Sequence, residues 1–313
     1  MAIPLPLPDR NITRHRSRPG ERAVVGLLAV CALASVLVTV GIVAVLAGET
    51  IRFFTKIPVL DFLTGTRWAP LGGRVEAGDF GVLPLVNGSL MIAAGSLFVG
   101  LPLGLATAVY LSEYARPRVR SVVKPVLEVL AGIPTVVVGF FALNFVTPSL
   151  LRPLFGEERV FIFNAAAGAV AVGLMILPVI ASISEDVMRA VPQALREAAF
   201  GLGASRRVVA LRVVMPAALS GIAASVILAV SRAVGETMAV TIASGNTPRL
   251  TTDFFESIQT LTAYIAQTVS GEAAAGTTRY QSLFAVGSTL FLMTLAMNVV
   301  SMRLVRRFRQ AYQ

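Results

Sequence analysis

Side chains that build enzyme and metal sites are scarce in this sequence. Among 313 residues there is one cysteine, Cys31, and one histidine, His15. A single cysteine excludes a disulfide within the chain, and Cys31 lies in an apolar run where it acts as a small hydrophobic residue. One histidine and one cysteine cannot supply a typical structural zinc site or an HExxH motif. The sequence therefore predicts no catalytic residue, no metal site and no cofactor.

Charge is also scarce, and lysine most of all. Only 14% of residues are charged, against about 25% in soluble domains, while 55% are hydrophobic. The two lysines, Lys56 and Lys124, follow Thr55 and Val123, so neither completes the Gly-Lys-Ser/Thr of a phosphate-binding loop. The net charge is +10, but the basic residues lie in gaps between apolar runs and form no continuous stripe. This pattern argues against nucleic acid and favours a membrane protein.

Six apolar runs are long enough to cross a bilayer, whose core needs about 20 apolar residues per helix. They occupy residues 23–48, 83–111, 122–147, 164–184, 217–244 and 282–302. The first lacks a small-residue cleavage pattern, so we interpret it as a retained anchor. Residues 1–22, with four prolines and five arginines, are expected to form a disordered cytoplasmic tail. The predicted fold class is all-α: a polytopic bundle of six transmembrane helices, with an external loop at 49–82 and a core at 83–313.

The positions of lysine and arginine predict the orientation. The tail, the loops 112–124 and 185–216, and the C-terminus hold five, four, five and four of them. The alternate loops 49–82, 148–160 and 245–281 hold four, two and two. Because cytoplasmic loops carry the excess of basic residues, both termini and the loop 185–216 are predicted to be cytoplasmic.

Two charges fall inside the fifth apolar run. Arg232 and Glu236 are four residues apart, so on a continuous helix they share one face. Each charge costs about 2.5–3.5 kcal/mol at a helix centre, so this face should point into protein or a polar path. One interpretation is an ion pair that fixes helix packing. We prefer a substrate path in which Arg232 binds phosphate oxygens, Glu236 orients the guanidinium, and Thr237 lies beside them.

Other features also have a structural and a functional interpretation. Glu128 lies four residues past Lys124, and we interpret it as that lysine's partner in a salt bridge. Trp68 is expected to be an interfacial anchor, with a docking contact as the alternative. Glycines and prolines inside the runs, such as Gly100 and Pro134, predict close helix packing or a bend that opens the pore.

The loop 185–216 contains a spaced pattern: Glu-Ala-Ala, three residues, glycine, and a terminal proline. It resembles the EAA loop of ABC importer permeases, E-A-A-x3-G-x9-I-x-L-P, with Val213 and Met215 as conservative departures. In that family the loop is the cytoplasmic helix that fits a groove on the ATP-hydrolysing subunit. The resemblance implies that five residues couple this chain to an ATPase: Glu197, Ala198, Ala199, Gly203 and Pro216.

A second resemblance concerns the cargo. The segment 232–240, Arg-Ala-Val-Gly-Glu-Thr-Met-Ala-Val, resembles the RA-x-GETMAV segment of PstC-type permeases of phosphate importers. Shorter phrases at 62–68, 80–84, 130–134, 244–248 and 280–308 extend the resemblance over residues 50–309. It implies a MetI-like permease in a bacterial inner membrane, with inorganic phosphate as cargo.

The same resemblance implies the partners: a homologous PstA-type permease, two ATPase subunits, an extracytoplasmic phosphate-binding protein and the surrounding lipid. ATP hydrolysis then belongs to a partner, and this chain is not an enzyme. Three alternatives stay open. One is a permease for another oxyanion, and another is a secondary transporter or channel that shares the buried charges but has no use for the EAA spacing. The third, a membrane enzyme, would need clustered acids, histidines or a nucleophile motif.

Overall fold

The computed structural model describes residues 19–70, 77–271, 274 and 276–309. It divides into two compact units, Met1–Gly48 and Glu49–Gln313. The described part of the first unit is a single helix, the beginning of α1 (Pro19–Phe54), with side chains exposed along almost its whole length. The expected tail at 1–22 lies outside the described residues up to residue 18, and helix α1 already begins at Pro19.

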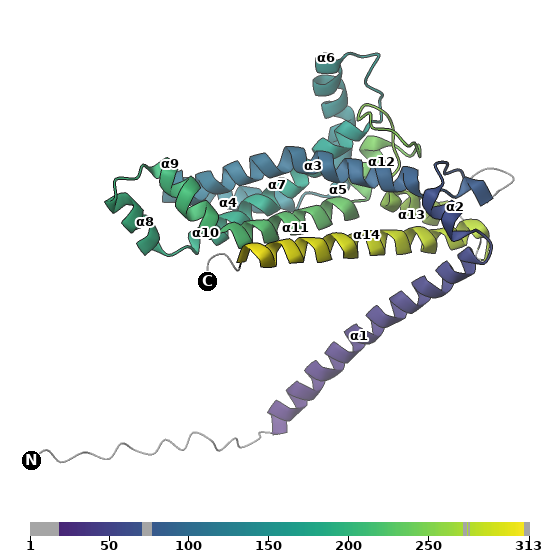
Figure 1. The fold of residues 1–313 in the computed structure, drawn as a ribbon, viewed down its shortest axis with the longest axis horizontal. Coiled ribbons are helices and arrows are strands. Elements are labelled where there is room, and N and C mark those ends of the chain that lie inside the picture. The colour runs from purple at the N-terminus through teal and green to yellow at the C-terminus, as the bar shows by residue number, and fades with distance from the viewer. Residues whose placement is uncertain (1–18, 71–76, 272–273, 275, 310–313) are drawn as a thin grey trace, which may run out of the picture. The chain divides into compact units, whose positions relative to one another are not determined.

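Helices build almost all of the second unit (Figure 1). The long ones are α3 (Leu83–Val109), α7 (Ala165–Arg189), α11 (Leu219–Gly235) and α14 (Thr278–Arg309). The shorter ones are α2 (Val59–Thr64), α4 (Pro117–Ala131), α5 (Thr135–Phe141), α6 (Arg152–Phe155), α8 (Gln193–Gly201), α9 (Arg206–Val208), α10 (Met215–Ala217), α12 (Met238–Ser244) and α13 (Leu261–Ser270). In the part of the chain that the structure describes, there are also three π-helical stretches and a 3₁₀ turn: η2 (Tyr110–Tyr114), η3 (Ala142–Leu151), η4 (Val209–Val214) and the turn η1 (Ala77–Asp79).

The predicted all-α membrane bundle is confirmed. Over the described residues, β structure is limited to one isolated bridge between Trp68 and Phe80. Within the described ranges, five helical segments are long and apolar enough to cross a membrane, or six if one bent pair counts as a span. They are Arg22–Phe54, Leu83–Tyr114, Thr135–Phe155, Ala165–Arg189 and Thr278–Arg303, with Arg206–Ala217 and Leu219–Gly235 as the pair bent by 72°.

Three predicted boundaries were wrong. The run 122–147 is not one helix, because the chain breaks at Gly132–Pro134 between α4 and α5, where proline disfavours helical backbone in the residue before it. Helix α7 continues to Arg189, so the loop predicted to begin at residue 185 begins later. The run 217–244 ends its helix at Gly235 and resumes in α12.

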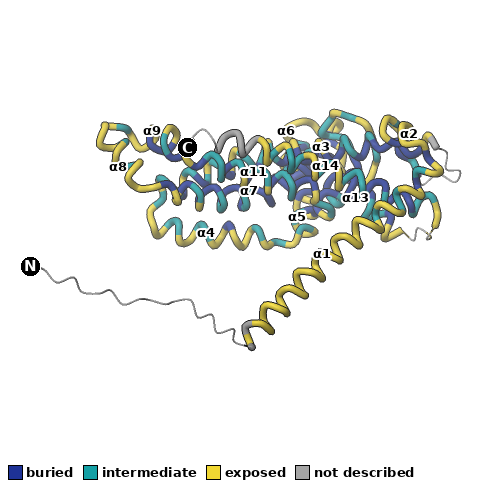
Figure 2. The backbone as a smooth tube through the Cα atoms, turned by 60° about the horizontal axis from the view of Figure 1, so that its bottom comes forward, coloured by how far each residue is buried: buried dark blue, intermediate teal, exposed yellow. Residues whose placement is uncertain are grey.

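Helices α3 and α7 pack closely at the centre of the second unit (Figure 2). A Cβ added to Gly100 of α3 would lie 2.7 Å from the carbonyl oxygen of Gly173 in α7, and one added to Gly104 would lie 2.9 Å from Ile180. The small residues therefore allow the two backbones to approach, as membrane helices require. The packing interpretation of Gly100 is confirmed.

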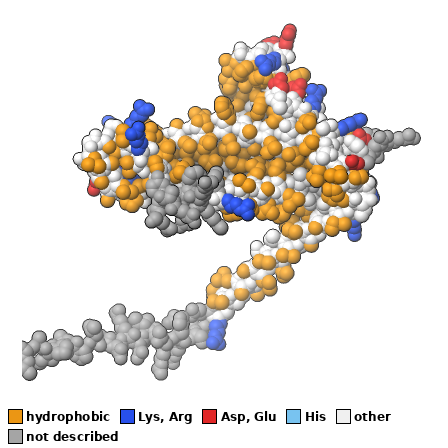
Figure 3. Space-filling view, viewed as in Figure 1, with side chains coloured by type: hydrophobic (Ala, Val, Ile, Leu, Met, Phe, Trp, Pro, Cys, Tyr) orange, Lys and Arg blue, Asp and Glu red, His pale blue; other side chains and the backbone are white. Residues whose placement is uncertain are grey.

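An aromatic cluster closes one end of the second unit. Trp68 is almost fully buried and packs edge-on against Phe62, Phe80 and Tyr264, with Phe53 behind them. Each aromatic contact of this kind adds about 0.5–1.5 kcal/mol beyond area burial. Both expectations for Trp68 were wrong, since a buried core residue is neither an interfacial anchor nor a docking contact. Away from this cluster, hydrophobic side chains cover most of the middle of the face in Figure 3, as lipid contact requires.

Candidate coupling segment and substrate path

Four of the five predicted coupling residues lie on α8 or in the turn that follows it, and Pro216 lies in α10. Glu197 and Ala198 are exposed on the helix, whereas Ala199 is partly buried against a core cluster that includes Ala108, Met188 and Val209. We call residues 193–217, from α8 through α10, the EAA segment. Its first helix follows Pro192, whose extended backbone turns the chain away from α7.

Gly203 ends α8 in a left-handed turn, with φ at +80°. The amide of Ala204 donates to the carbonyl of Ala199 at 3.1 Å, and the amide of Gly203 donates to the carbonyl of Phe200 at 2.9 Å. These two bonds form a Schellman motif, in which the glycine position is left-handed and the flanking apolar residues meet. Ala199 and Ala204 pack against the same core cluster. The spacing between Ala199 and Gly203 is therefore the spacing that this helix end requires.

The rest of the EAA segment leads into the fifth span. After α9 and η4, Pro216 occupies the first turn of α10, where its missing N–H is tolerated, and the chain bends by 72° into α11. Several large apolar side chains on the segment are exposed, and Leu202 is the most exposed at 90%. The others are Leu195, Phe200, Val208 and Leu211. Grouped exposed apolar side chains are typical of a protein interaction surface.

The candidate substrate path lies where α11 is interrupted. Arg232 is half-buried in the last turn of α11, and within the described residues no hydrogen bond or ion pair involves its side chain. Glu236 lies beyond the helix end in extended backbone, and its Oε1 accepts from the amides of Thr237 at 3.1 Å and Ala239 at 3.3 Å. Glu236 therefore caps α12.

This geometry corrects the predicted pair. Arg232 and Glu236 do not share a helical face, because the backbone leaves the helix at Gly235. The first amides of α12 lack partners within that helix, and they attract the carboxylate that would otherwise turn to the guanidinium. The structure brings Glu236 and Thr237 together at the break and places Arg232 one turn before it.

Neighbouring hydroxyl and amide groups hold this break. Thr262 of α13 donates to the carbonyl of Glu236 at 2.9 Å, and Thr237 donates to the carbonyl of Gly235 at 3.3 Å. Ser231, the residue before Arg232, donates to Asn298 of α14 at 2.8 Å. The break therefore has bonded partners on α13 and α14, and the bond from Thr262 satisfies a backbone carbonyl that lipid cannot.

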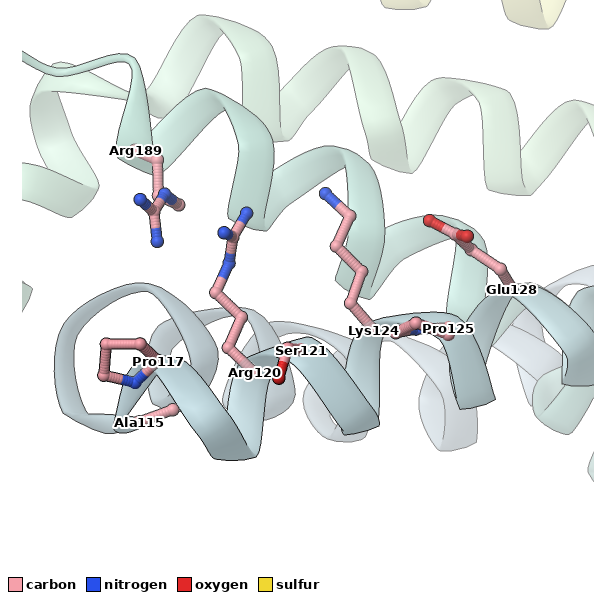
Figure 4. Close-up of a pocket in the computed structure, with 8 residues that line it drawn as sticks. All are labelled: Ala115, Pro117, Arg120, Ser121, Lys124, Pro125, Glu128 and Arg189. Atoms are coloured by element: carbon pink, nitrogen blue, oxygen red, sulfur yellow. The ribbon is translucent and has the colours of Figure 1, made fainter.

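A second charged cluster, for which the sequence led to no prediction, surrounds Glu185 of α7. Its side chain is fully buried, accepts from Nε of Arg120 at 2.7 Å and from Nζ of Lys124 at 3.0 Å, and lies 3.8 Å from Nε of Arg189. Figure 4 shows Arg120 and Lys124 reaching from α4 toward α7. The sequence does contain a pattern that could have predicted this cluster, because Glu185 directly follows an apolar run and precedes Arg189 by one helical turn.

The cluster also corrects the interpretation of Glu128. Lys124 pairs with Glu185 and Asp186, and over the described part of the chain no ion pair joins it to Glu128. The hydrogen bond to Glu185 raises the pKa of Arg120. Burial alone would lower the pKa of Lys124, but its hydrogen bonds to Asp186 and Glu185 outweigh that effect and raise the pKa. Because the pKa of Lys124 is raised in the folded protein, its ion pairs stabilise the fold at pH values below the free lysine pKa of about 10.4. This stabilisation is lost only above that pH, so the ion pairs between α4 and α7 persist at neutral pH.

Cavities flank this cluster and the membrane core. One of about 360 Å³ lies between α4 and α7, and Glu128, Arg120, Lys124 and Arg189 contribute to its lining. Another of about 470 Å³ is almost wholly apolar and is lined by residues of α3, α7 and the segment at Phe254 and Phe255. Within the described ranges, no three His, Cys, Asp or Glu side chains gather as a metal site.

Known proteins share both sequence and fold with this chain. Residues 100–313 match the family model described as binding-protein-dependent transport system inner membrane component. The phosphate transport system permease protein PstC of Mesorhizobium japonicum is 33% identical over 262 residues, covering 79% of this chain and 78% of the relative. The probable ABC transporter permease protein YqgH of Bacillus subtilis is 33% identical over 270 residues, covering 86% and 85%.

A solved structure agrees at the level of the fold. A chain of the bacterial alginate ABC transporter, crystallised with a periplasmic protein bound to an alginate pentasaccharide, has a TM-score of 0.63 and 16% identity. The match covers 91% of this chain and 96% of that chain. The family match over two thirds of the sequence, the relatives and the helical fold lead to one conclusion. The chain belongs to the inner membrane components of binding-protein-dependent transport systems, the MetI-like permeases of ABC importers.

Proposed function

We propose that this chain is a permease subunit of an ABC importer for inorganic phosphate. The observation that carries the proposal is Arg232, a half-buried guanidinium on a membrane helix without a partner among the described residues. A charge at such a place costs about 2.5–3.5 kcal/mol unless a ligand or a polar path compensates it. Arginine presents planar N–H donors that match phosphate oxygens. The relatives described as phosphate permeases support the same cargo.

Glu236 and Thr237 contribute to this path as parts of the helix break. Because Glu236 caps α12, its carboxylate is already bonded to two amides and carries less negative potential toward a passing anion. The capped break thus leaves Arg232 as the group that meets the anion. Discontinuous helices of this kind form substrate sites in many transporters.

The EAA segment is the proposed docking element for the ATPase. Its support is the exposed face of Glu197 and Ala198, the apolar side chains around them, and the shaped turn at Gly203. ATP binding by the partner would move α8, and the movement would pass through Pro216 into α11, which carries Arg232. Both termini and the EAA segment are then cytoplasmic. A second permease of the PstA type, two ATPase subunits and an external phosphate-binding protein complete the importer.

Uptake of labelled phosphate tests the cargo. The complex is reconstituted with its co-expressed partners in proteoliposomes, with ATP supplied on the EAA side and with sulfate and arsenate as competitors. We expect ATP-dependent uptake that arsenate reduces and sulfate does not. Stronger competition by sulfate would indicate another oxyanion. Uptake by this chain alone under an ion gradient would indicate a secondary transporter.

Coupling needs its own test. Gly203→Asp should leave partner assembly possible but lower uptake per ATP hydrolysed, because it places a charged side chain in the docking turn. Glu197→Ala should act in the same direction. If Gly203→Asp changed neither partner binding nor uptake, the coupling role would be wrong.

A further inference from the structure

Arg196, the residue before the EAA triplet, makes more bonds than its neighbours on α8. Its guanidinium donates to Glu113 at 3.1 Å and 3.4 Å through two nitrogens. It also donates to the carbonyl of Val191 at 2.6 Å and the carbonyl of Met188 at 2.8 Å. One side chain therefore satisfies four acceptor contacts, close to the full set of five donors that a guanidinium offers.

These acceptors belong to three different elements. Met188 lies at the C-terminal end of α7 and Val191 in the connection after it, where the negative end of the helix dipole attracts a cation. Glu113 lies in η2, the π-helical end of the α3 span, 83 residues before Arg196. The contact thus joins α8 to two membrane helices at once.

Burial separates this pair from an ordinary surface salt bridge. The side chain of Arg196 is 11% exposed and that of Glu113 is 8% exposed. Exposed arginines on the same segment, such as Arg206 and Arg207, lie within the described chain without such partners. A two-nitrogen contact of arginine with a carboxylate is directional, and lysine cannot reproduce it.

We propose that Arg196 is a positioning residue that locks α8 to α3 and α7. Movement of α8 is then passed to α3 through Glu113 and to α7 through the carbonyls, in addition to the chain connection into α11. This inference rests on the proposed role of the EAA segment as the ATPase docking element. Without the lock, α8 could still dock but would turn independently of the spans.

Two readouts test the lock in the assembled importer. The first is the ratio of cargo uptake to ATP hydrolysis in proteoliposomes for Arg196→Lys and Glu113→Gln. Arg118→Lys, at an exposed arginine on α4 outside the EAA segment, is the control. We expect each variant of the lock to lower the ratio by about tenfold while ATPase copurification is unchanged. The double variant should lose no more than Arg196→Lys alone, because Glu113 acts through Arg196, whereas Arg196 also bonds to the carbonyls of Met188 and Val191.

The second readout is a distance that does not depend on cargo. Spin labels at Ala194 on α8 and Tyr114 on η2, both exposed, report how firmly the two elements are held. Arg196→Lys should broaden the distance distribution, and Arg118→Lys should leave it narrow. Absence of phosphate uptake by the unmodified complex would count against the proposed function alone. An unchanged distribution and an unchanged ratio in Arg196→Lys, or additive losses in the double variant, would overturn the lock.

Discussion

Two groups of charged side chains in this protein differ in whether they are paired with an opposite charge. Near the EAA segment, Glu185 and Glu113 are buried and bonded to arginine or lysine from another element. In the last turn of α11, Arg232 is half-buried without a partner among the described residues, and Glu236 turns to backbone amides. Paired charges fasten helices together, whereas an unpaired charge is available to a ligand. The first group holds helices together, and we propose a role in substrate transport for the second.

A substitution of Arg232 gives the strongest test of the difference between the paired and the unpaired charges. Arg232→Gln should lower phosphate uptake by about 100-fold, since a charge-assisted contact with an anion is worth about 1.5–3 kcal/mol. Assembly and thermal stability should hardly change, because no bond within the described residues is lost. Labelled-phosphate uptake measures the effect, and Arg118→Gln, an exposed arginine on α4, is the control. Normal uptake by Arg232→Gln would remove the distinction between the two groups.

Glu185 should show the reverse behaviour. Glu185→Ala leaves Arg120 and Lys124 without their buried partner and should destabilise the protein by about 3–5 kcal/mol. The midpoint of thermal unfolding of the purified complex in detergent measures this. Asp186→Asn is the matched control, because Asp186 is exposed and its pairing with Lys124 is open to solvent. Equal midpoints for the two variants would mean that burial of Glu185 does not matter to stability.

Substitutions at Gly203 test whether the EAA segment needs the left-handed backbone of this turn or the glycine residue itself. A Cβ at this position meets nothing within 4 Å, so the penalty for Gly203→Val comes from the positive φ and is about 1–2 kcal/mol. Uptake should fall several-fold with valine and remain near normal with Gly203→Asn, since asparagine tolerates left-handed backbone. A loss as large with asparagine as with valine would point to a direct contact of the glycine backbone.

Thr262 should give the smallest effect. Thr262→Val removes the hydrogen bond to the carbonyl of Glu236 and should cost about 0.5–1.5 kcal/mol at the helix break. We expect a modest rise in the phosphate concentration needed for half-maximal uptake, and near-normal behaviour for Thr262→Ser, which keeps the hydroxyl. If serine and valine behaved alike, the hydroxyl would have no role in shaping the break.

Several parts of the fold and the site were predictable because they depend on local sequence. Run length predicted the helical spans of α3, α7 and α14, since about 20 apolar residues are what a bilayer demands. Ala199 and Gly203 were marked as members of one spaced pattern, and the structure shows that the two residues belong to a Schellman motif. Gly100 indicated close packing because a glycine inside an apolar helix is otherwise costly.

Other parts depended on competition between neighbours, which a single run of residues does not reveal. Glu236 seemed placed to pair with Arg232, but the free amides of α12 are closer once the helix ends at Gly235. Lys124 seemed placed to pair with Glu128 on its own helix, but α7 offers a buried carboxylate instead. Trp68 is buried because Tyr264, far along the chain, packs against it.

By itself the sequence determined the class of protein, because hydrophobic length, basic residues between the runs and the EAA spacing are all local properties. Only the tertiary structure decided which charged side chains form ion pairs within the protein and which remain available to a ligand. That outcome depends on which helices lie side by side, since a carboxylate bonds to the nearest donor in space. Glu113 and Arg196 are 83 residues apart and become partners only when α8 folds back against the end of α3.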